Sequence, residues 1–196
     1  MDDSMRIARS ELILGGQKSG KSRRAELLAS SWLAGSPAHK TVLIATAQPW
    51  DDEMRERIAH HRRDRAERVP AMQTVEEPVR LAEALARHSH PDTLVVVDCL
   101  TLWLTHLLMP AEEFKEKEAV TLDTPAQTAM LLRAIENAAG PVVLVGNEIG
   151  LGVIPLGRET RAFVDALGLL NQDVAQACQR VTLMVAGLPL NLKGRP

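Results

Sequence analysis

The sequence predicts an α/β fold of the P-loop NTPase-like (RecA-like) type, in which helices cover both faces of a mostly parallel sheet. Short apolar runs have the length and the Val, Ile and Leu content of strands buried on both faces; they span residues 11–14, 41–46, 93–98, 142–145 and 181–186. Helical patterns separate these runs, and such alternation favours a parallel sheet. A glycine-rich loop directly follows the first run. The chain of 196 residues suits one nucleotide-binding domain, 1–196, with residues 1–10 as a frayed lead-in.

The composition narrows the class of partner. Hydrophobic residues make up 45% and charged residues 24% of the chain, as in ordinary globular proteins. The net charge of −2 provides no global field for nucleic acid or an anionic membrane, and the 3 Trp, 2 Phe and no Tyr argue against a base-stacking surface. Two cysteines without a CxxC pair favour a reducing cytoplasm. The sequence predicts neither an export signal nor a membrane span, because it has no apolar signal region and no apolar run of the required length.

The loop Gly15–Ser22 fits the phosphate-binding pattern G-x-x-x-x-G-K-[ST]. Glycine lets successive backbone N–H groups face inward around anionic oxygens, and the helix that follows points its positive end at the same place. Lys21 would reach the β- and γ-phosphates as a catalytic cation, and the Ser22 hydroxyl would bind Mg²⁺. The alternative is a glycine turn without a ligand. The predicted nucleotide-binding residues of the loop are Gly15, Gly16, Gln17, Lys18, Ser19, Gly20, Lys21 and Ser22.

Asp98 ends the clearest apolar run of the chain. A carboxylate in this place is where a P-loop protein keeps its second Mg²⁺-associated acid, although a strand-end cap without a metal role is the alternative. Polar segments also follow the other runs, at 46–50 and 147–152. Since the carboxyl ends of parallel strands share one edge of the sheet, we expect these segments to gather around the P-loop.

The remaining elements follow in chain order. We expect helices from the P-loop to about 33, and at 51–68, 76–88, 99–108, 126–139 and 158–180, with a weak strand at 71–75 and a short tail from Gly187. The charge-rich segment 112–118 reads as a solvated loop or a short exposed helix.

The predicted helix 51–68 is unusually polar. Twelve of its eighteen residues are Asp, Glu or Arg, and Met54 and Ile58 give only a narrow apolar stripe. Such a helix cannot lie in the core. We expect it on the surface, over a cleft or against another subunit.

His60 and His61 stand in the middle of this helix, among several arginines. Nearby cations disfavour the imidazolium form and keep a ring nitrogen unprotonated. A neutral imidazole is a competent nucleophile, and arginines can hold the phosphates that it attacks, so a covalent histidine–nucleotidyl intermediate is one interpretation. Two exposed histidines without a role are the alternative. Zinc binding is disfavoured, because adjacent helical residues point about 100° apart and no cysteine accompanies them.

Several motifs together carry a resemblance to a known family. Beside the P-loop with Arg23, they are 44–48, Asp51-Asp52-Glu53-Met54, 57–62, 98–103, 147–155, Arg161, Phe163, Asp165, Gly168, 171–172, 187–189 and Lys193. On these residues the chain resembles the bifunctional adenosylcobinamide kinase/adenosylcobinamide-phosphate guanylyltransferase family of cobalamin biosynthesis. Three positions depart from the family pattern: Leu14, where Ser or Thr is usual, His106, where Asn is common, and the segment 112–118.

The resemblance implies two reactions. A nucleoside triphosphate, ATP or GTP, phosphorylates the aminopropanol hydroxyl of adenosylcobinamide; GTP then guanylylates an enzyme histidine, and GMP passes to the new phosphate. By position in the motif, His60 matches the guanylylated histidine. Nucleotide contacts map onto Ala45, Thr46 and Ala47, onto His61, Arg62, Arg63 and Asp64, and onto the acidic residues Glu76 and Asp98. The family also implies a homotrimer. Two other functions remain open: a simple P-loop small-molecule kinase without a covalent step, and a GTP-dependent switch.

Overall fold

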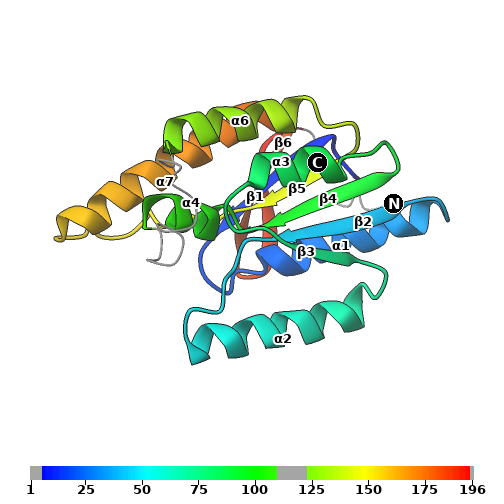
Figure 1. Cartoon of the computed structure of the whole chain (residues 1–196), viewed down its shortest axis with the longest axis horizontal. Helices are drawn as coiled ribbons and strands as arrows, with labels where there is room; N and C mark the ends of the chain where they lie inside the picture. Colours follow the sequence, from blue (N-terminus) through cyan, green and yellow to red (C-terminus); the bar gives the residue numbers. More distant parts are fainter. Residues whose placement is uncertain (1–5, 110–122, 195–196) are drawn as a thin grey trace.

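The computed structural model describes residues 6–109 and 123–194. Its centre is a seven-stranded sheet with the strand order β3-β2-β4-β5-β1-β6-β7 (Figure 1). All neighbouring strands are parallel except β6 and β7, which pair antiparallel. The strands are β1 (Ser10–Gly15), β2 (Lys40–Ala45), β3 (Gln73–Glu76), β4 (Thr93–Asp98), β5 (Val142–Val145), β6 (Arg180–Val185) and β7 (Leu188–Lys193). The predicted α/β class with a mostly parallel sheet is confirmed.

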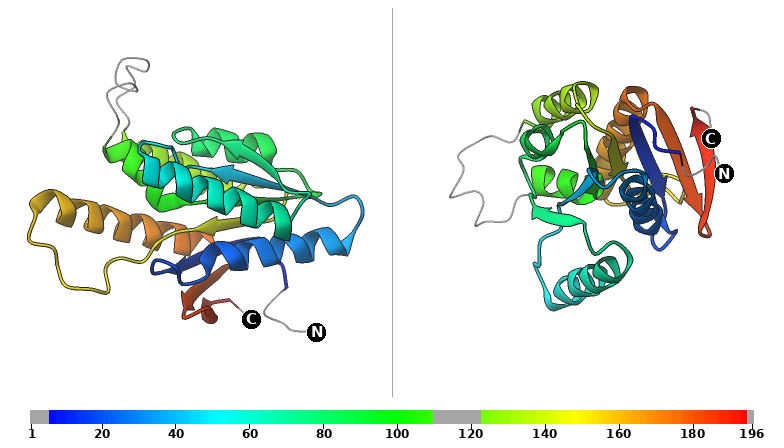
Figure 2. Two further views of the ribbon diagram at one scale, coloured as in Figure 1. Left: turned by 90° about the horizontal axis from the view of Figure 1, so that it is seen from below. Right: turned by 90° about the vertical axis from the view of Figure 1, so that its right-hand side faces the viewer.

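Helices cover both faces of the sheet, as the alternating pattern predicts. In Figure 1, α1 and α2 lie on one side of the sheet, whereas α3, α4, α6 and α7 lie on the other, and the end-on view of Figure 2 shows the same layers. The helices are α1 (Lys21–Gly35), α2 (Asp52–Arg68), α3 (Leu81–His88), α4 (Leu100–Leu108), α6 (Thr124–Glu136) and α7 (Arg158–Ala177). No helix of the described ranges is long and apolar enough to cross a membrane.

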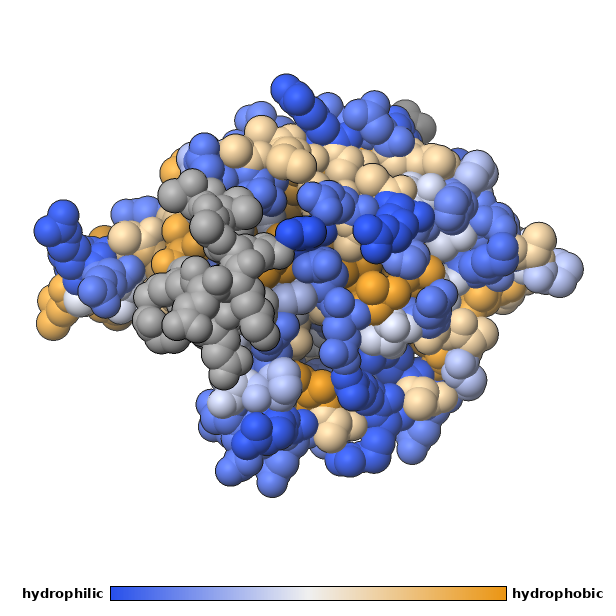
Figure 3. All heavy atoms as spheres, in the orientation of Figure 1, coloured by the Kyte–Doolittle hydropathy of each residue, from blue (hydrophilic) through white to orange (hydrophobic). Residues whose placement is uncertain are grey.

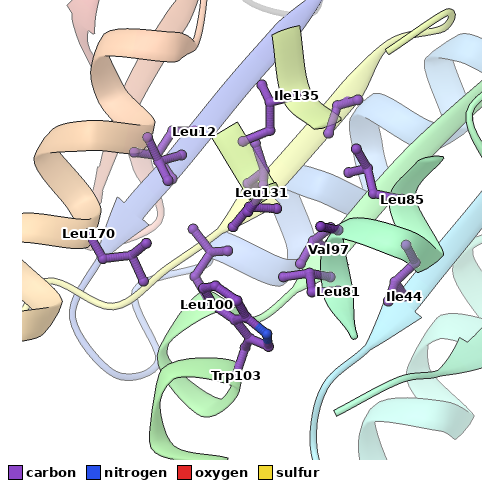
Figure 4. Close-up of a cluster of buried hydrophobic side chains, with 14 of the residues drawn as sticks. Leu12, Ile44, Leu81, Leu85, Val97, Leu100, Trp103, Leu131, Ile135 and Leu170 are labelled. Carbon is purple, nitrogen blue, oxygen red and sulfur yellow. The ribbon is translucent and has the colours of Figure 1, made fainter. Parts of the chain in front are cut away.

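Two apolar cores hold the layers together. The larger one joins the sheet to α3, α4, α6 and α7, and Trp103 lies fully buried in it, beside Leu100 and Leu81 (Figure 4). The Trp103 indole N–H donates to the Val79 carbonyl at 2.8 Å, which satisfies its polar edge. The smaller core lies under α1 and includes Ile13, Leu28 and Val96. The site is therefore built on strands that are packed from both sides.

The helix predicted at 76–88 begins later, at Leu81. Glu76 instead completes β3, opposite Ala45 of β2. Pro78 explains the difference, because the residue before a proline is driven away from helical backbone angles. The Glu77 carboxylate then accepts hydrogen bonds from the N–H groups of Val79 and Arg80, at 3.0 and 2.8 Å.

Other boundaries also differ from the sequence-based expectation. The first helix extends to Gly35, α6 covers 124–136 rather than 126–139, and α7 ends at Ala177 rather than near 180. The segment expected as a tail contains an edge strand, β7. Its sequence does not predict a strand, because it contains Pro189 and all six of its residues are exposed. The prediction that residues 1–10 are frayed is wrong for the end of this range, because Ser10 belongs to β1 and Ala8 is buried. The segment 112–118 lies outside the described residues.

The predicted helix 51–68 is confirmed as α2, with Asp51 as its N-cap residue accepting from the Met54 N–H at 2.7 Å. None of its residues is buried. Figure 3 shows hydrophilic side chains over most of the surface where α2 lies, as its sequence requires.

Candidate nucleotide site

The P-loop connects β1 to α1 through backbone angles that favour glycine. Gly15 and Gly20 have φ values of 152° and 101°, and Lys18 has a φ of 55°. A Cβ atom on Gly15 would stand 2.6 Å from the Met184 carbonyl oxygen, so a side chain has no room there. Residues with positive φ in a loop that leads into a helix are typical of an anion-binding nest.

Lys21 lies within this loop. Its Nζ donates to the Gly16 carbonyl at 2.5 Å and lies 3.5 Å from the Ser19 hydroxyl. Burial lowers the pKa of Lys21; the charge of Asp98 opposes this shift, and that of Arg57 adds to it. The ammonium group is thus held at the loop and is largely removed from water, where its charge acts strongly on phosphate oxygens.

Ser22 at the start of α1 and Asp98 at the end of β4 come together. The Ser22 hydroxyl donates to Asp98 Oδ2 at 2.9 Å, although β5 lies between β1 and β4 in the sheet. A hydroxyl and a carboxylate are oxygen ligands of the kind that Mg²⁺ accepts beside substrate phosphates. The described residues contain no group of three or more His, Cys, Asp or Glu side chains that could hold a metal. A hydroxyl–carboxylate pair of this kind is chemically suited to Mg²⁺.

Thr46 fixes the backbone next to this pair. Its hydroxyl donates to the Cys99 carbonyl at 2.7 Å and accepts from the Cys99 N–H at 2.8 Å. Its side chain is buried, so the segment 45–47 can contact a ligand through its backbone but not through the Thr46 hydroxyl.

His106 lies next to Thr46. The sequence marks it only as a departure from the family pattern. Its Nε2 lies 2.9 Å from the Thr46 carbonyl, which can only accept, so the hydrogen is on Nε2. Burial lowers the pKa of His106 and keeps the ring neutral. The indole ring of Trp50 lies over it, with ring centroids 5.7 Å apart. His106 therefore acts as a packing support for the segment 45–47.

The loop after β5 forms another wall of the site. Glu148 N–H donates to the Gly15 carbonyl at 3.1 Å, which ties this loop directly to the start of the P-loop. Asn147 N–H donates to the Thr101 hydroxyl at 2.9 Å, and Asn171 Nδ2 donates to the Asn147 carbonyl at 3.1 Å. Thr101 and Asn171 belong to the motifs quoted above, but their supporting roles emerge only from these contacts.

One face of α2 is directed toward the site. The charge of Arg57 acts on Lys21, and that of Asp98 acts on Arg65, whose pKa burial lowers. At the end of the helix Arg68 forms an ion pair of 2.8 Å with Glu26 of α1. Arg57 and Arg65 are among the arginines expected to hold phosphates near the histidines, but the sequence does not single them out from the other arginines of the helix. Their spacing of eight, with His61 midway, is the signal that could have found them, because residues four apart share a helix face.

The two histidines differ in where they lie on α2. His61 shares the face of Arg57 and Arg65, whereas His60 points about 100° away from it. Both are exposed, with ring centroids 6.3 Å apart. Within the described ranges no hydrogen bond or ion pair joins either ring to the P-loop. His60 Nδ1 instead lies 3.3 Å from Asp64 Oδ1.

The other predicted nucleotide contacts on α2 have different surroundings. Arg62 forms an ion pair with Glu76 at the end of β3, so these two residues contact each other. Asp64 pairs with His60 and Arg68 along the helix. Arg63 is exposed on the surface of α2. The structure thus gathers the P-loop, Ser22, Asp98 and the segment 45–47 at one edge of the sheet, and keeps 60–64 on the adjacent helix.

Comparison with known proteins shows which family the chain matches. Residues 11–192 match the family model described as cobinamide kinase / cobinamide phosphate guanyltransferase. The chain is 47% identical over 190 residues to the bifunctional adenosylcobalamin biosynthesis protein CobP of Pseudomonas aeruginosa, covering 95% of this chain and 98% of that protein. It is 35% identical over 187 residues to the bifunctional adenosylcobalamin biosynthesis protein CobU of Escherichia coli, covering 93% and 98%.

A solved structure shares the fold at low identity. The structure titled as a structural study of PH0250 from Pyrococcus horikoshii OT3 aligns with a TM-score of 0.54 and 8% identity, covering 97% of this chain and 89% of that chain. At this identity the likeness concerns the fold alone. The family assignment comes from the model match and the two relatives, whose length this chain spans almost fully. The chain belongs to the cobinamide kinase/cobinamide phosphate guanylyltransferase family.

Proposed function

We propose that this single domain, residues 1–196, catalyses two successive transfers on a corrinoid. A nucleoside triphosphate first phosphorylates the hydroxyl of adenosylcobinamide. GTP then transfers GMP to the new phosphate, and adenosylcobinamide-GDP and pyrophosphate are formed. The contact that carries this proposal is the hydrogen bond of 2.9 Å between Ser22 and Asp98, because it joins the P-loop to the carboxylate at the end of β4.

The kinase step uses the P-loop. Its backbone N–H groups hold the phosphate chain, and Lys21 neutralises charge that develops on the β- and γ-phosphates during transfer. Ser22 and Asp98 would hold Mg²⁺, which bridges phosphate oxygens and offsets their charge. Three arginines of α2 add positive charge near the same edge of the sheet. Arg62 pairs with Glu76, and Arg57 and Arg65 lie close enough to interact with Lys21 and Asp98.

The guanylyl step uses α2. The α-phosphorus of GTP is attacked by His60, and pyrophosphate leaves; the phosphate of the corrinoid then takes the guanylyl group from the histidine. Arginine side chains of α2 are suited to hold phosphates through paired N–H donors. This role gives the exposed, charge-rich helix a chemical purpose that a simple kinase does not require.

We further propose a homotrimer in a reducing cytoplasm. Five large apolar side chains of the loop before α7 are exposed, and a neighbouring subunit would cover such a surface; they are Ile149, Leu151, Val153, Ile154 and Leu156. The charged helix α2 would also gain a subunit to face. The cytoplasm agrees with Cys99 and Cys178, which are free thiols.

Labelling tests the covalent step. The protein is incubated with [α-³²P]GTP and Mg²⁺, and acid-labile, base-stable label on the protein is measured, as a phosphoramidate requires. We expect label in the parent and in His61→Ala, and none in His60→Ala. Label retained in His60→Ala would contradict the assignment of His60. Absence of label in the parent, with kinase activity intact, would favour the simple P-loop kinase.

A further inference from the structure

A run of side chains joins His60 to the helix that begins at the P-loop. His60 Nδ1 lies 3.3 Å from Asp64 Oδ1, Asp64 Oδ2 lies 3.2 Å from Arg68 Nη2, and Arg68 Nη1 lies 2.8 Å from Glu26 Oε2. Glu26 stands four residues after Ser22 on α1, and only 9% of its side chain is exposed. The run therefore connects α2 to a nearly buried anchor close to the phosphate-binding loop.

From this geometry we infer that Asp64 is a positioning residue, which holds Nδ1 of His60 and leaves Nε2 as the atom that takes the guanylyl group. The inference rests on the proposed function, in which His60 carries GMP. The two atoms, His60 Nδ1 and Asp64 Oδ1, lie 3.3 Å apart as an ion pair and do not form a hydrogen bond in this structure. Because a carboxylate can only accept, its charge beside Nδ1 favours the neutral tautomer with the hydrogen on Nδ1 and the lone pair on Nε2.

Arg68 keeps the carboxylate in place. It donates to the Asp64 oxygen that does not face His60, and Glu26 in turn holds Arg68 and raises its pKa through a hydrogen bond and its charge. Without this anchor, an exposed pair of residues four apart on a helix would be weakly oriented. With it, the Asp64 carboxylate is held relative to α1 and stands beside Nδ1 of His60.

The adjacent histidine has no equivalent partner. Among the described residues, His61 forms no hydrogen bond or ion pair, and its one ring contact is with His60. Two neighbouring imidazoles on one helix are therefore chemically distinct, because only His60 has a carboxylate at Nδ1. This difference selects His60 as the nucleophile independently of its position in a motif.

The step balances in atoms and charge. The Nε2 lone pair of the neutral ring attacks the α-phosphorus of GTP, and the bond from that phosphorus to the bridging oxygen breaks, with pyrophosphate taking the electron pair. The ring becomes an N-phosphorylated imidazolium with its hydrogen still on Nδ1, and the Asp64 carboxylate stabilises the new positive charge. When a phosphate oxygen of the acceptor attacks the same phosphorus, the N–P bond breaks and the neutral ring returns.

The experiment identifies the labelled nitrogen. The full chain is labelled with [α-³²P]GTP and Mg²⁺, the nucleoside is removed by periodate oxidation and elimination, and the alkaline digest is compared with Nδ1- and Nε2-phosphohistidine standards. We expect only the Nε2 isomer in the parent. In Asp64→Asn the labelling rate falls by about 10-fold or more and the Nδ1 isomer is formed as well, because the amide no longer fixes the tautomer. Glu67→Gln, an exposed carboxylate of the same helix, labels like the parent.

The outcomes separate the two proposals. The Nδ1 isomer in the parent, or a parental rate with the Nε2 isomer alone in Asp64→Asn, would overturn the role of Asp64 and leave the covalent step intact. No label in a parent that still phosphorylates the corrinoid would overturn the covalent step itself. A denaturant unfolding curve that matches the parent shows that Asp64→Asn is folded, so that a loss of label reports on His60.

Discussion

The P-loop and α2 are built in opposite ways. The P-loop is fixed by backbone angles, by the carbonyl of Met184 behind Gly15 and by strands that are packed on both faces. Helix α2 has no buried residue, and side-chain ion pairs to Glu26 and Glu76 attach it to the rest of the molecule. The proposed phosphate-binding loop is thus part of the core, whereas the proposed guanylyl-carrying histidine lies on a helix that ion pairs help to hold.

The largest effect is expected at Lys21. Lys21→Ala should lower kcat of corrinoid phosphorylation by about 10²–10³-fold, because a preorganised cation is removed from a desolvated site. Steady-state kinase assays at saturating nucleotide measure it. Lys40→Ala removes an exposed lysine at the start of β2 and is the matched control. Near-parental turnover in Lys21→Ala would contradict the P-loop assignment.

Asp98 should have the next largest effect. Asp98→Asn keeps the size of the side chain and removes its charge, so the Mg²⁺ concentration for half-maximal kinase activity should rise by on the order of 10–100-fold. A Mg²⁺ titration of both proteins measures the shift. An unchanged Mg²⁺ requirement would reduce Asp98 to a strand-end partner of Ser22.

A pair of glycines tests how rigidly the P-loop is built. Gly15→Ala should lower the free energy of unfolding by about 1–3 kcal/mol, because its Cβ would meet the Met184 carbonyl at 2.6 Å and its φ is 152°. Gly168→Ala should raise it by about 0.5–1 kcal/mol, because this residue lies within α7 and its Cβ would meet nothing within 4 Å. Denaturant unfolding measures both, and equal effects would contradict the contrast.

The smallest effect is expected where α2 meets α1. Arg68→Ala should lower the free energy of unfolding only slightly, since the Arg68 side chain is 43% exposed and water screens its pair with Glu26. The same variant should slow labelling by GTP more than it slows the kinase. A large loss of stability would show that α2 is part of the folding core rather than attached to it.

Local patterns predicted what local physics decides. The P-loop, Asp98 at the end of β4 and the bounds of α2 could be read from short stretches, because glycine, strand length and capping act within a few residues. The boundary between β3 and α3 differs from the expectation because Pro78 keeps the residue before it out of helical backbone angles. β7 was missed because its one partner, β6, covers only one of its edges.

The rest of the site depends on contacts between distant parts of the chain. The approach of Arg57 to Lys21 and of Arg65 to Asp98 follows from how α2 lies against α1 and β3, which no window of the sequence contains. The support of Thr46 by His106, sixty residues later, is of the same kind. Composition indicated that α2 is unusual, but only the fold shows which side of the helix faces Lys21 and Asp98.

The central claim of the proposal is that the P-loop serves the phosphoryl transfer, whereas His60 serves only the guanylyl transfer. Kinase turnover and [α-³²P]GTP labelling are therefore measured side by side in Lys21→Ala and His60→Ala. We predict that His60→Ala keeps kinase turnover and loses label, whereas Lys21→Ala loses kinase turnover. Loss of kinase turnover in a folded His60→Ala, or label that persists in it, would contradict this division of labour.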